Sequence, residues 1–307
     1  MQPTKHAEYE NEDAPAPRDG AGLGTLYVVA TPIGNLADLT VRARDVLGAA
    51  DVIAAEDTRH TRNLLAHYGI GTRLTSLHEH NEAAASAKVL RLLASGQQVA
   101  LVSDAGTPGI ADPGARLVAA AHVAGHRVVP LPGANAAVTA VSASGLDGPF
   151  LFYGFLPVKQ GERRRALQTL AHQAHNLVFY EAPHRIVEAV ADAALVLGGG
   201  KPARTVVIAR ELTKKFEAIH VGELDAAPAW LDEDADRQRG EFVLVVSGAV
   251  ADAAGELAAA ETTLRALLSE LPLKQAVKLA HAISGAPRNR LYERALEIAA
   301  EESGTEK

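Results

Sequence analysis

Apolar runs that end in loops of glycine, proline and small polar residues are the feature that most restricts the fold of this 307-residue chain. The longest of these loops follows residues 99–102 and extends to Gly114, and the same order of strand and loop recurs over residues 26–35 and 128–136. Short apolar runs bounded by turn residues are typical of buried strands, and open α/β sheets bind ligands where such strands end. The sequence therefore predicts three loops that meet at one crevice.

Strand and helix patterns alternate from residue 25 to residue 144, which implies parallel βαβ units. A second α/β segment begins at Phe150, and its expected strands lie at 150–153, 176–180, 205–209, 217–222 and 242–247. We therefore predict an α/β fold with two domains, over residues 24–148 and 149–248, because the chain is long enough to bury a core in each.

The two ends of the chain have a different composition. Residues 1–23 are poor in large apolar side chains and rich in Pro, Gly, Ala and charge, which predicts a disordered acidic tail. Residues 249–260 are rich in Ala and Gly and are expected to form a linker. Residues 261–300 are helical in pattern and carry Lys and Arg, as in a helix-turn-helix-like RNA contact, although packing against a dimer partner is an alternative.

Composition narrows the class of protein. The chain has no cysteine, so it contains neither disulfides nor thiolate metal sites. No apolar run reaches about 18 residues, and the N-terminus lacks a signal-peptide core, so we expect a cytoplasmic protein without a membrane partner. The formal net charge of −7 includes an excess of Asp and Glu at both ends, and the body between them can still present a basic face.

Charged residues follow several expected strands and could face a shared cleft. Glu56 and Asp104 do so in the first half, and Glu181 and Arg210 in the second. Helix caps and solvated strand ends explain each of them individually, but their recurrence in both halves favours a site. The pair His78 and His80 lacks a third ligand, so we predict no metal site and expect a polar active-site or structural role.

Short motifs that follow these strands occur in a fixed order between residues 24 and 298. They are TPIGNL at 31–36, EDTR at 56–59, HEHNE at 78–82, SDAGTP at 103–108, PG at 132–133, GFLP at 154–157, FYE at 179–181, HR at 184–185, ARELTK at 209–214 and GE at 240–241. Together they resemble the ribosomal RNA small subunit methyltransferase I family, which belongs to the tetrapyrrole methylase superfamily.

The resemblance implies an enzyme that folds S-adenosylmethionine into the cleft between its domains and methylates the ribose 2′-hydroxyl of a cytidine in the decoding region of 16S rRNA. It also implies a homodimer. Superfamily positions carried onto this chain give the expected cofactor contacts, which are Pro32, Ser103, Asp104, Thr107, Asn135, Ala136, Glu181, Arg210 and Glu241. The tetrapyrrole enzymes have a Thr-Ser pair where this chain has Asn135 and Ala136, and this difference favours the ribosomal branch.

Methyl transfer to a sugar hydroxyl needs alignment of the reacting atoms and is helped by a positioned base. Spacing does not choose between Glu56, Asp57, Glu181, the two histidines and Lys214. Our first assignments are Glu181 as electrostatic support near the sulfonium, His78 and His80 for the hydroxyl, and Glu56 as a further catalytic carboxylate.

Binding to RNA requires cations along a path of phosphates. The residues expected to supply them are Arg163, Arg164, Arg165, Lys214, Lys274, Arg288 and Arg290. The alternative to RNA binding for these groups of basic residues is an ordinary solvent-exposed helix face. Two other functions remain open at this point, namely a small-molecule methyltransferase of the tetrapyrrole type, which needs no basic helical tail, and a non-enzymatic RNA-binding module.

Overall fold

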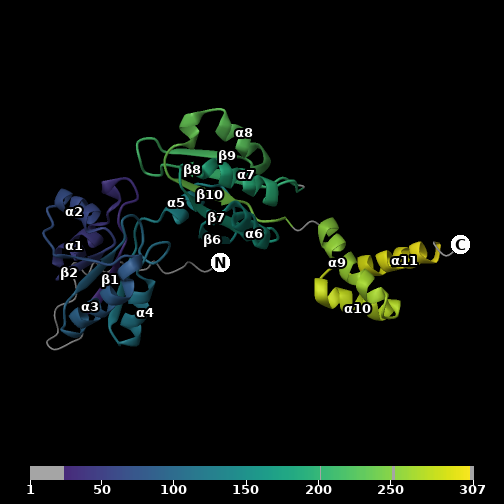
Figure 1. The fold of residues 1–307 in the computed structure, drawn as a ribbon, viewed down its shortest axis with the longest axis horizontal. Helices are drawn as coiled ribbons and strands as arrows, with labels where there is room; N and C mark the ends of the chain where they lie inside the picture. The colour runs from purple at the N-terminus through teal and green to yellow at the C-terminus, as the bar shows by residue number, and fades with distance from the viewer. Residues whose placement is uncertain (1–23, 201, 251–252, 305–307) are drawn as a thin grey trace, which may run out of the picture.

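The computed structural model describes residues 24–200, 202–250 and 253–304 (Figure 1). The predicted acidic tail, residues 1–23, lies outside the described residues. The described part consists of an N-terminal lobe around one five-stranded sheet, a C-terminal lobe around a second five-stranded sheet, and a helical module formed by residues 253–304.

The sheet of the N-terminal lobe is entirely parallel, as predicted, with strand order β3-β2-β4-β1-β5. Its strands are β1 (Thr25–Val29), β2 (Val52–Ala55), β3 (Leu74–Ser76), β4 (Val99–Val102) and β5 (Arg127–Leu131). Successive residues of a strand point to opposite faces, and both faces of this sheet are covered by helices, which explains why the strands are continuous apolar runs. Helices α1 (Val41–Ala49) and α2 (Thr58–His67) cover one face, and α3 (Glu82–Ala94) and α4 (Ala115–Val123) cover the other.

The crevice of this sheet lies between β1 and β4. These neighbouring strands continue toward opposite edges of the sheet, since β1 leads to β2 and β4 leads to β5. The loops after them are joined by two backbone hydrogen bonds of 2.9 Å between Thr31 and Gly106. Gly106 has a φ of 77°, a conformation in which a side chain would be strained.

The sheet of the C-terminal lobe is mixed, with order β6-β7-β10-β8-β9. Its strands are β6 (Phe150–Phe155), β7 (Asn176–Glu181), β8 (Thr205–Arg210), β9 (Ala218–Glu223) and β10 (Phe242–Val246). The last strand, β10, inserts antiparallel between β7 and β8, whereas β6 and β7 pair in parallel. Strand spacing alone did not reveal this insertion.

Helices cover the two faces of the second sheet unequally. One face packs against α6 (Gln160–Leu170), α7 (Ile186–Leu197) and α8 (Ala227–Asp232). On the other face, Ala137 and Ala140 of α5 (Ala136–Ser142) pack against β7, β8 and β10. Because α5 directly follows β5 of the first sheet, it fixes the two lobes against each other.

The helical module consists of α9 (Ala253–Leu268), α10 (Leu273–Ser284) and α11 (Arg288–Gly304), which pack on one another (Figure 1). The structure differs here from the predicted linker over residues 249–260, because α9 already begins at Ala253. The remaining short elements are the 3₁₀ helices η1 (Leu36–Asp38), η2 (Glu79–Asn81), η3 (Leu224–Ala226) and η4 (Ala235–Gln238). None of the described helices is long and apolar enough to cross a lipid bilayer.

Candidate active site

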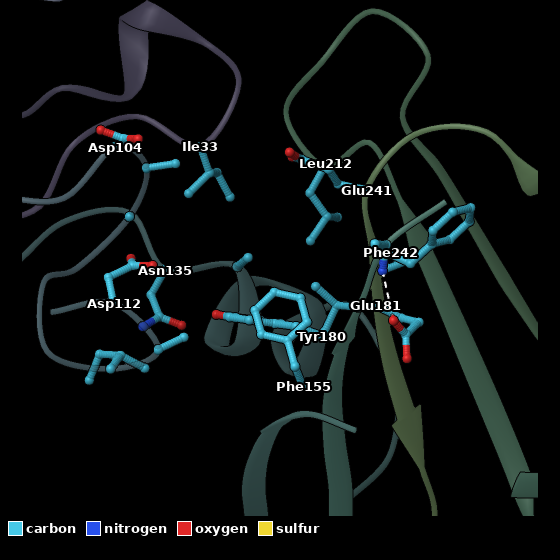
Figure 2. Close-up of a pocket in the computed structure, with 18 of the residues that line it drawn as sticks. Ile33, Asp104, Asp112, Asn135, Phe155, Tyr180, Glu181, Leu212, Glu241 and Phe242 are labelled. Carbon is cyan, nitrogen blue, oxygen red and sulfur yellow. Dashed lines mark hydrogen bonds between the residues drawn. The ribbon is translucent and has the colours of Figure 1, made fainter. Parts of the chain in front are cut away.

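A cavity of about 420 Å³ opens between the two lobes (Figure 2). The N-terminal lobe lines it with Ile33, Glu56, Asp104, Ala105, Gly106, Thr107, Ile110, Ala111, Asp112, Asn135 and Ala136. The C-terminal lobe lines it with Phe155, Tyr180, Glu181, Ala182, Pro183, Ala209, Leu212, Lys214, Glu241, Phe242 and Val243. This size is typical of a pocket for a small organic ligand.

The loops after β1, β4 and β5 meet at this cavity, which confirms the prediction of one shared crevice. The Thr31 hydroxyl donates to the Ser103 carbonyl at 3.1 Å and so joins the first loop to the second. The Thr107 hydroxyl donates to the Ala134 carbonyl at 3.0 Å and joins the second loop to the third. The three loops therefore form one hydrogen-bonded wall.

Three carboxylates gather on this wall. The Asp104 side chain accepts the Asp57 amide at 2.9 Å, and the Glu56 carboxylate accepts the Asp104 amide at 3.4 Å. Burial raises the pKa of Glu56, and the negative charge of Asp112 raises it further. Burial also raises the pKa of Asp112. The wall of the N-terminal lobe is thus negatively charged and suited to a cationic ligand.

Aromatic and apolar side chains dominate the opposite wall (Figure 2). The ring of Tyr180 lies 5.6 Å from that of Phe155, and Leu212 and Phe242 extend the apolar surface. The Tyr180 hydroxyl accepts the amide of Ala137 at 3.2 Å, at the beginning of α5. This hydrogen bond connects the C-terminal sheet to the helix that follows the third loop.

The carboxylate of Glu181 points away from the open part of the cavity (Figure 2). Its Oε1 accepts the Ala182 amide at 2.9 Å and lies 3.3 Å from Nε of Arg185, and the residue is only 2% exposed. Burial raises the pKa of Glu181 even though the Arg185 charge opposes this shift. The side chain therefore supports the wall from behind.

Lys214 enters the cavity from the segment after β8. Its ammonium group lies 2.8 Å from a carboxylate oxygen of Glu211 and 2.8 Å from one of Glu241. Glu211 and Thr213 both have positive φ, at 51° and 66°, so this segment is held in a strained conformation of the kind that clusters at functional sites. A Cβ on Gly34 would lie 2.4 Å from Lys214 Cγ, which shows how closely the first loop meets this segment.

Comparison with known proteins identifies the family. The model of the tetrapyrrole (corrin/porphyrin) methylases matches residues 25–228, and the model described as the RsmI C-terminal HTH domain matches residues 250–299. The chain is 51% identical to ribosomal RNA small subunit methyltransferase I of Escherichia coli O157:H7, over 89% of this chain and 95% of that protein. It is 48% identical to the protein of the same name from Xylella fastidiosa strain Temecula1, over 88% and 98%.

The chain belongs to the ribosomal RNA small subunit methyltransferase I family. Membership confirms the prediction of a methyltransferase that uses S-adenosylmethionine. Among solved structures, the methyltransferase CobJ is similar with a TM-score of 0.54 and 22% identity, over 74% of this chain and 95% of that one. Diphthine synthase is similar with a TM-score of 0.52 and 16% identity, over 73% and 90%. Both likenesses concern the fold, and they confirm the predicted α/β class.

Most of the expected cofactor residues of the methyltransferase line the cavity, namely Asp104, Thr107, Asn135, Ala136, Glu181 and Glu241. Pro32, Ser103 and Arg210 are not among the described lining residues. Ser103 is buried beneath the loop, and its hydroxyl lies within hydrogen-bond distance of the carbonyls of Ala105 and Gly106. Arg210 points to the other side of its strand, where its guanidinium donates to the carbonyls of Asp236, Arg239 and Phe216.

The expected catalytic histidines lie elsewhere. His78 and His80 follow β3, and neither is among the described residues that line the cavity. Strand β3 is at the edge of the sheet, separated from the β1–β4 crevice by β2. His78 is half-buried and His80 is exposed at the short 3₁₀ helix η2, and the strand order places this helix away from the site.

Two of the predicted RNA contacts are engaged inside the protein. Arg163 is completely buried, with its Nε 2.7 Å from the carboxylate of Asp192, so it does not reach a phosphate and this prediction is wrong. Arg164 lies 2.6 Å from the same carboxylate, although its side chain is 40% exposed. Lys214 faces the cavity instead of an outer surface. Among the predicted RNA contacts, the exposed cations are Arg165 on α6 and Lys274, Arg288 and Arg290 in the helical module.

Sequence reasoning missed Asp112 and the aromatic wall. Asp112 lies in the same loop as Asp104, and this position is the feature of the sequence that indicates a further carboxylate at the site. Tyr180 and Phe155 belong to motifs that the sequence already displays, but only the structure shows that their rings turn toward the cleft (Figure 2).

Proposed function

We propose that this protein transfers a methyl group from S-adenosylmethionine to the 2′-hydroxyl of a cytidine ribose in the decoding region of 16S rRNA. The observation that carries the proposal is the single cavity between the lobes, with carboxylates on one wall and aromatic side chains on the other. The named relatives, which are ribosomal RNA methyltransferases, support the choice of substrate.

The cavity fits the chemistry of S-adenosylmethionine. The donor carries a sulfonium and an ammonium group, and Glu56 and Asp104 offer negative charge to such cations. Its adenine ring would find apolar surface at Ile33, Leu212 and the neighbouring aromatic side chains. When bound, the donor supplies an activated methyl group, and the contribution of the protein is to align the acceptor hydroxyl and to exclude water.

The charge of the cavity also favours this substrate over a tetrapyrrole. Tetrapyrrole precursors carry several carboxylates, and an acidic wall disfavours them because like charges repel in a half-buried site. A ribose hydroxyl is neutral, and its phosphates can remain outside the cavity. Lys274, Arg288 and Arg290 of the helical module are exposed and suited to phosphate contacts there.

The deciding experiment incubates the protein with labelled S-adenosylmethionine and small ribosomal subunits from a strain that lacks the enzyme, and then maps the methylated ribose. We expect one 2′-O-methylcytidine in the decoding region. The triple variant Lys274→Glu, Arg288→Glu and Arg290→Glu should bind RNA more weakly and with a smaller salt dependence, while its affinity for S-adenosylmethionine stays unchanged. Label on a base, or on no RNA at all, would refute the proposal.

We also propose that the enzyme acts as a homodimer in the cytoplasm, where small ribosomal subunits are found. The homodimer is expected from the superfamily resemblance, and light scattering of the purified protein tests it. A mass equal to that of one chain at micromolar concentration would contradict the dimer.

A further inference from the structure

Asp112 is a half-buried carboxylate of the cavity wall and stands in the same loop as Asp104. The other lining carboxylates are engaged by cations or backbone amides, as described above for Glu181, Glu241, Asp104 and Glu56. Asp112 instead has the Ser103 hydroxyl, a neutral group, beside it, and no ion pair of the described residues involves it. A carboxylate that is not paired with a cation keeps its capacity to accept a proton.

A second carboxylate holds the Asp112 segment in place. The buried Glu82 of α3 accepts the amide of Gly114 at 3.0 Å and that of Arg116 at 3.3 Å. Gly114 is the N-cap of α4 and has no side chain to cap the helix, so Glu82 takes over this role from another helix. A Cβ on Gly114 would lie 2.8 Å from Leu101 Cδ2, so Gly114 also packs closely against the core. The chain just after Asp112 is therefore anchored on two sides.

The ionisable groups around Asp112 come from both lobes. Asp104 and Glu56 face it from the N-terminal lobe, and Tyr180 faces it from the C-terminal lobe. Lys214, the one cation among the described lining residues, is already paired with Glu211 and Glu241. Burial, and then the charge of Asp104, raise the pKa of Asp112, although the neighbouring Ser103 hydroxyl opposes the shift. A carboxylate with a raised pKa is a stronger base at neutral pH.

We propose that Asp112 is the general base of the reaction, an inference that rests on the function proposed above. The bond between the ribose oxygen and the methyl carbon forms as the bond between that carbon and sulfur breaks, and sulfur keeps the electron pair. The hydroxyl proton passes to the Asp112 carboxylate and from there to solvent. Glu82 acts as a positioning residue for this group.

The test compares Asp112→Asn with the wild-type enzyme over a series of pH values on both sides of neutrality. Asparagine keeps the size of the side chain, but its amide does not take up a proton in this role. We expect the single-turnover rate on small ribosomal subunits to fall about 10²–10⁴-fold and its rise with pH to disappear. Calorimetric affinity for S-adenosylmethionine should change by less than about threefold. The matched control is Asp232→Asn, an exposed position at the end of α8, which should keep the rate and the pH profile.

A measurement on the wild-type protein guards against a variant that fails to fold. The carboxyl carbon of Asp112, followed by NMR, should titrate above the ordinary aspartate range and at the midpoint of the kinetic profile. The inference is overturned if Asp112→Asn keeps its rate or its pH dependence, if it loses donor binding as fully as it loses rate, or if Glu56→Gln abolishes the pH dependence instead. A wild-type enzyme that methylates no small-subunit RNA would refute the proposed function itself, and this result is distinct from a failure of Asp112 alone.

Discussion

The two lobes differ in where their charged side chains lie. In the N-terminal lobe, the carboxylates Glu56, Asp104 and Asp112 stand at the cavity wall. In the C-terminal lobe, the ion pair between Arg163 and Asp192 is buried between α6 and α7, while aromatic side chains face the cavity.

This difference follows from the two sheets. A parallel sheet ends all its strands at one edge, where backbone loops leave polar side chains exposed to the crevice. In the mixed sheet of the C-terminal lobe, one face packs against α6 to α8, and part of the other face turns its side chains toward α5 and the cavity. We therefore expect that loss of charge impairs ligand binding in the N-terminal lobe and stability in the C-terminal lobe.

The largest expected effect is that of Arg163→Ala. The substitution removes the completely buried partner of Asp192, which is 2% exposed, and leaves only the partly exposed Arg164 beside this carboxylate. Breaking a buried ion pair from one side costs about 3–5 kcal/mol. Urea denaturation should show this loss in the free energy of unfolding, whereas Arg165→Ala, at an exposed position of the same helix, should change it by less than about 0.5 kcal/mol. Equal losses for the two variants would contradict a structural role for the buried ion pair.

In the N-terminal lobe, Asp104→Asn should weaken S-adenosylmethionine binding about tenfold, or about 1.4 kcal/mol, with little change in thermal stability. The amide oxygen of asparagine can still accept from Asp57, so mainly the negative charge is lost. Calorimetry measures the affinity, and Asp232→Asn serves as the control. A large drop in melting temperature with intact affinity would show that this wall is structural.

A smaller effect is expected for Glu56→Gln, which should raise the stability of the protein instead of lowering it. Because burial raises the pKa of Glu56, its contribution to stability is fully present below its unfolded pKa and is lost as the pH rises through the folded value. At pH 7 the glutamine variant should therefore be more stable than wild type, in contrast to Arg163→Ala. Melting temperatures at pH 5 and pH 7 test this, with the exposed Glu79→Gln as control. A destabilised variant at pH 7 would count against the contrast between the lobes.

The smallest effect concerns the helical module, which contributes nothing to the described cavity lining. Glu261 of α9 lies 2.7 Å from Arg265 and 2.7 Å from Arg294 of α11, and these hydrogen bonds lower its pKa to about 2. The stability that it supplies is present above the unfolded pKa and is lost as the pH falls toward 2. In the full-length chain, Glu261→Gln should speed hydrogen exchange in α9 and α11 at neutral pH and reduce its acid dependence. The control variant Glu270→Gln should leave hydrogen exchange in α9 and α11 unchanged. Unchanged exchange in Glu261→Gln would show that Glu261 does not stabilise the helical module.

The local features of this protein follow from the order of its residues alone. Apolar runs and turn residues fixed the strands and the loops after them, and the motifs in these loops identified the family, because both depend on neighbouring residues and on backbone preferences. They also indicated that Glu56, Asp104 and Asn135 stand at strand ends.

Which of these features lie close together depends on the three-dimensional packing of the chain. The strand order moved His78 to an edge and brought Asp112 to the crevice, and the packing of α6 against α7 buried Arg163. A side chain's environment is set by elements that are distant in sequence, such as Glu82 of α3 beneath the Asp112 loop. Local sequence patterns specify where charged residues lie along the chain. Long-range packing determines whether each charge faces an ion-pair partner, a ligand or water.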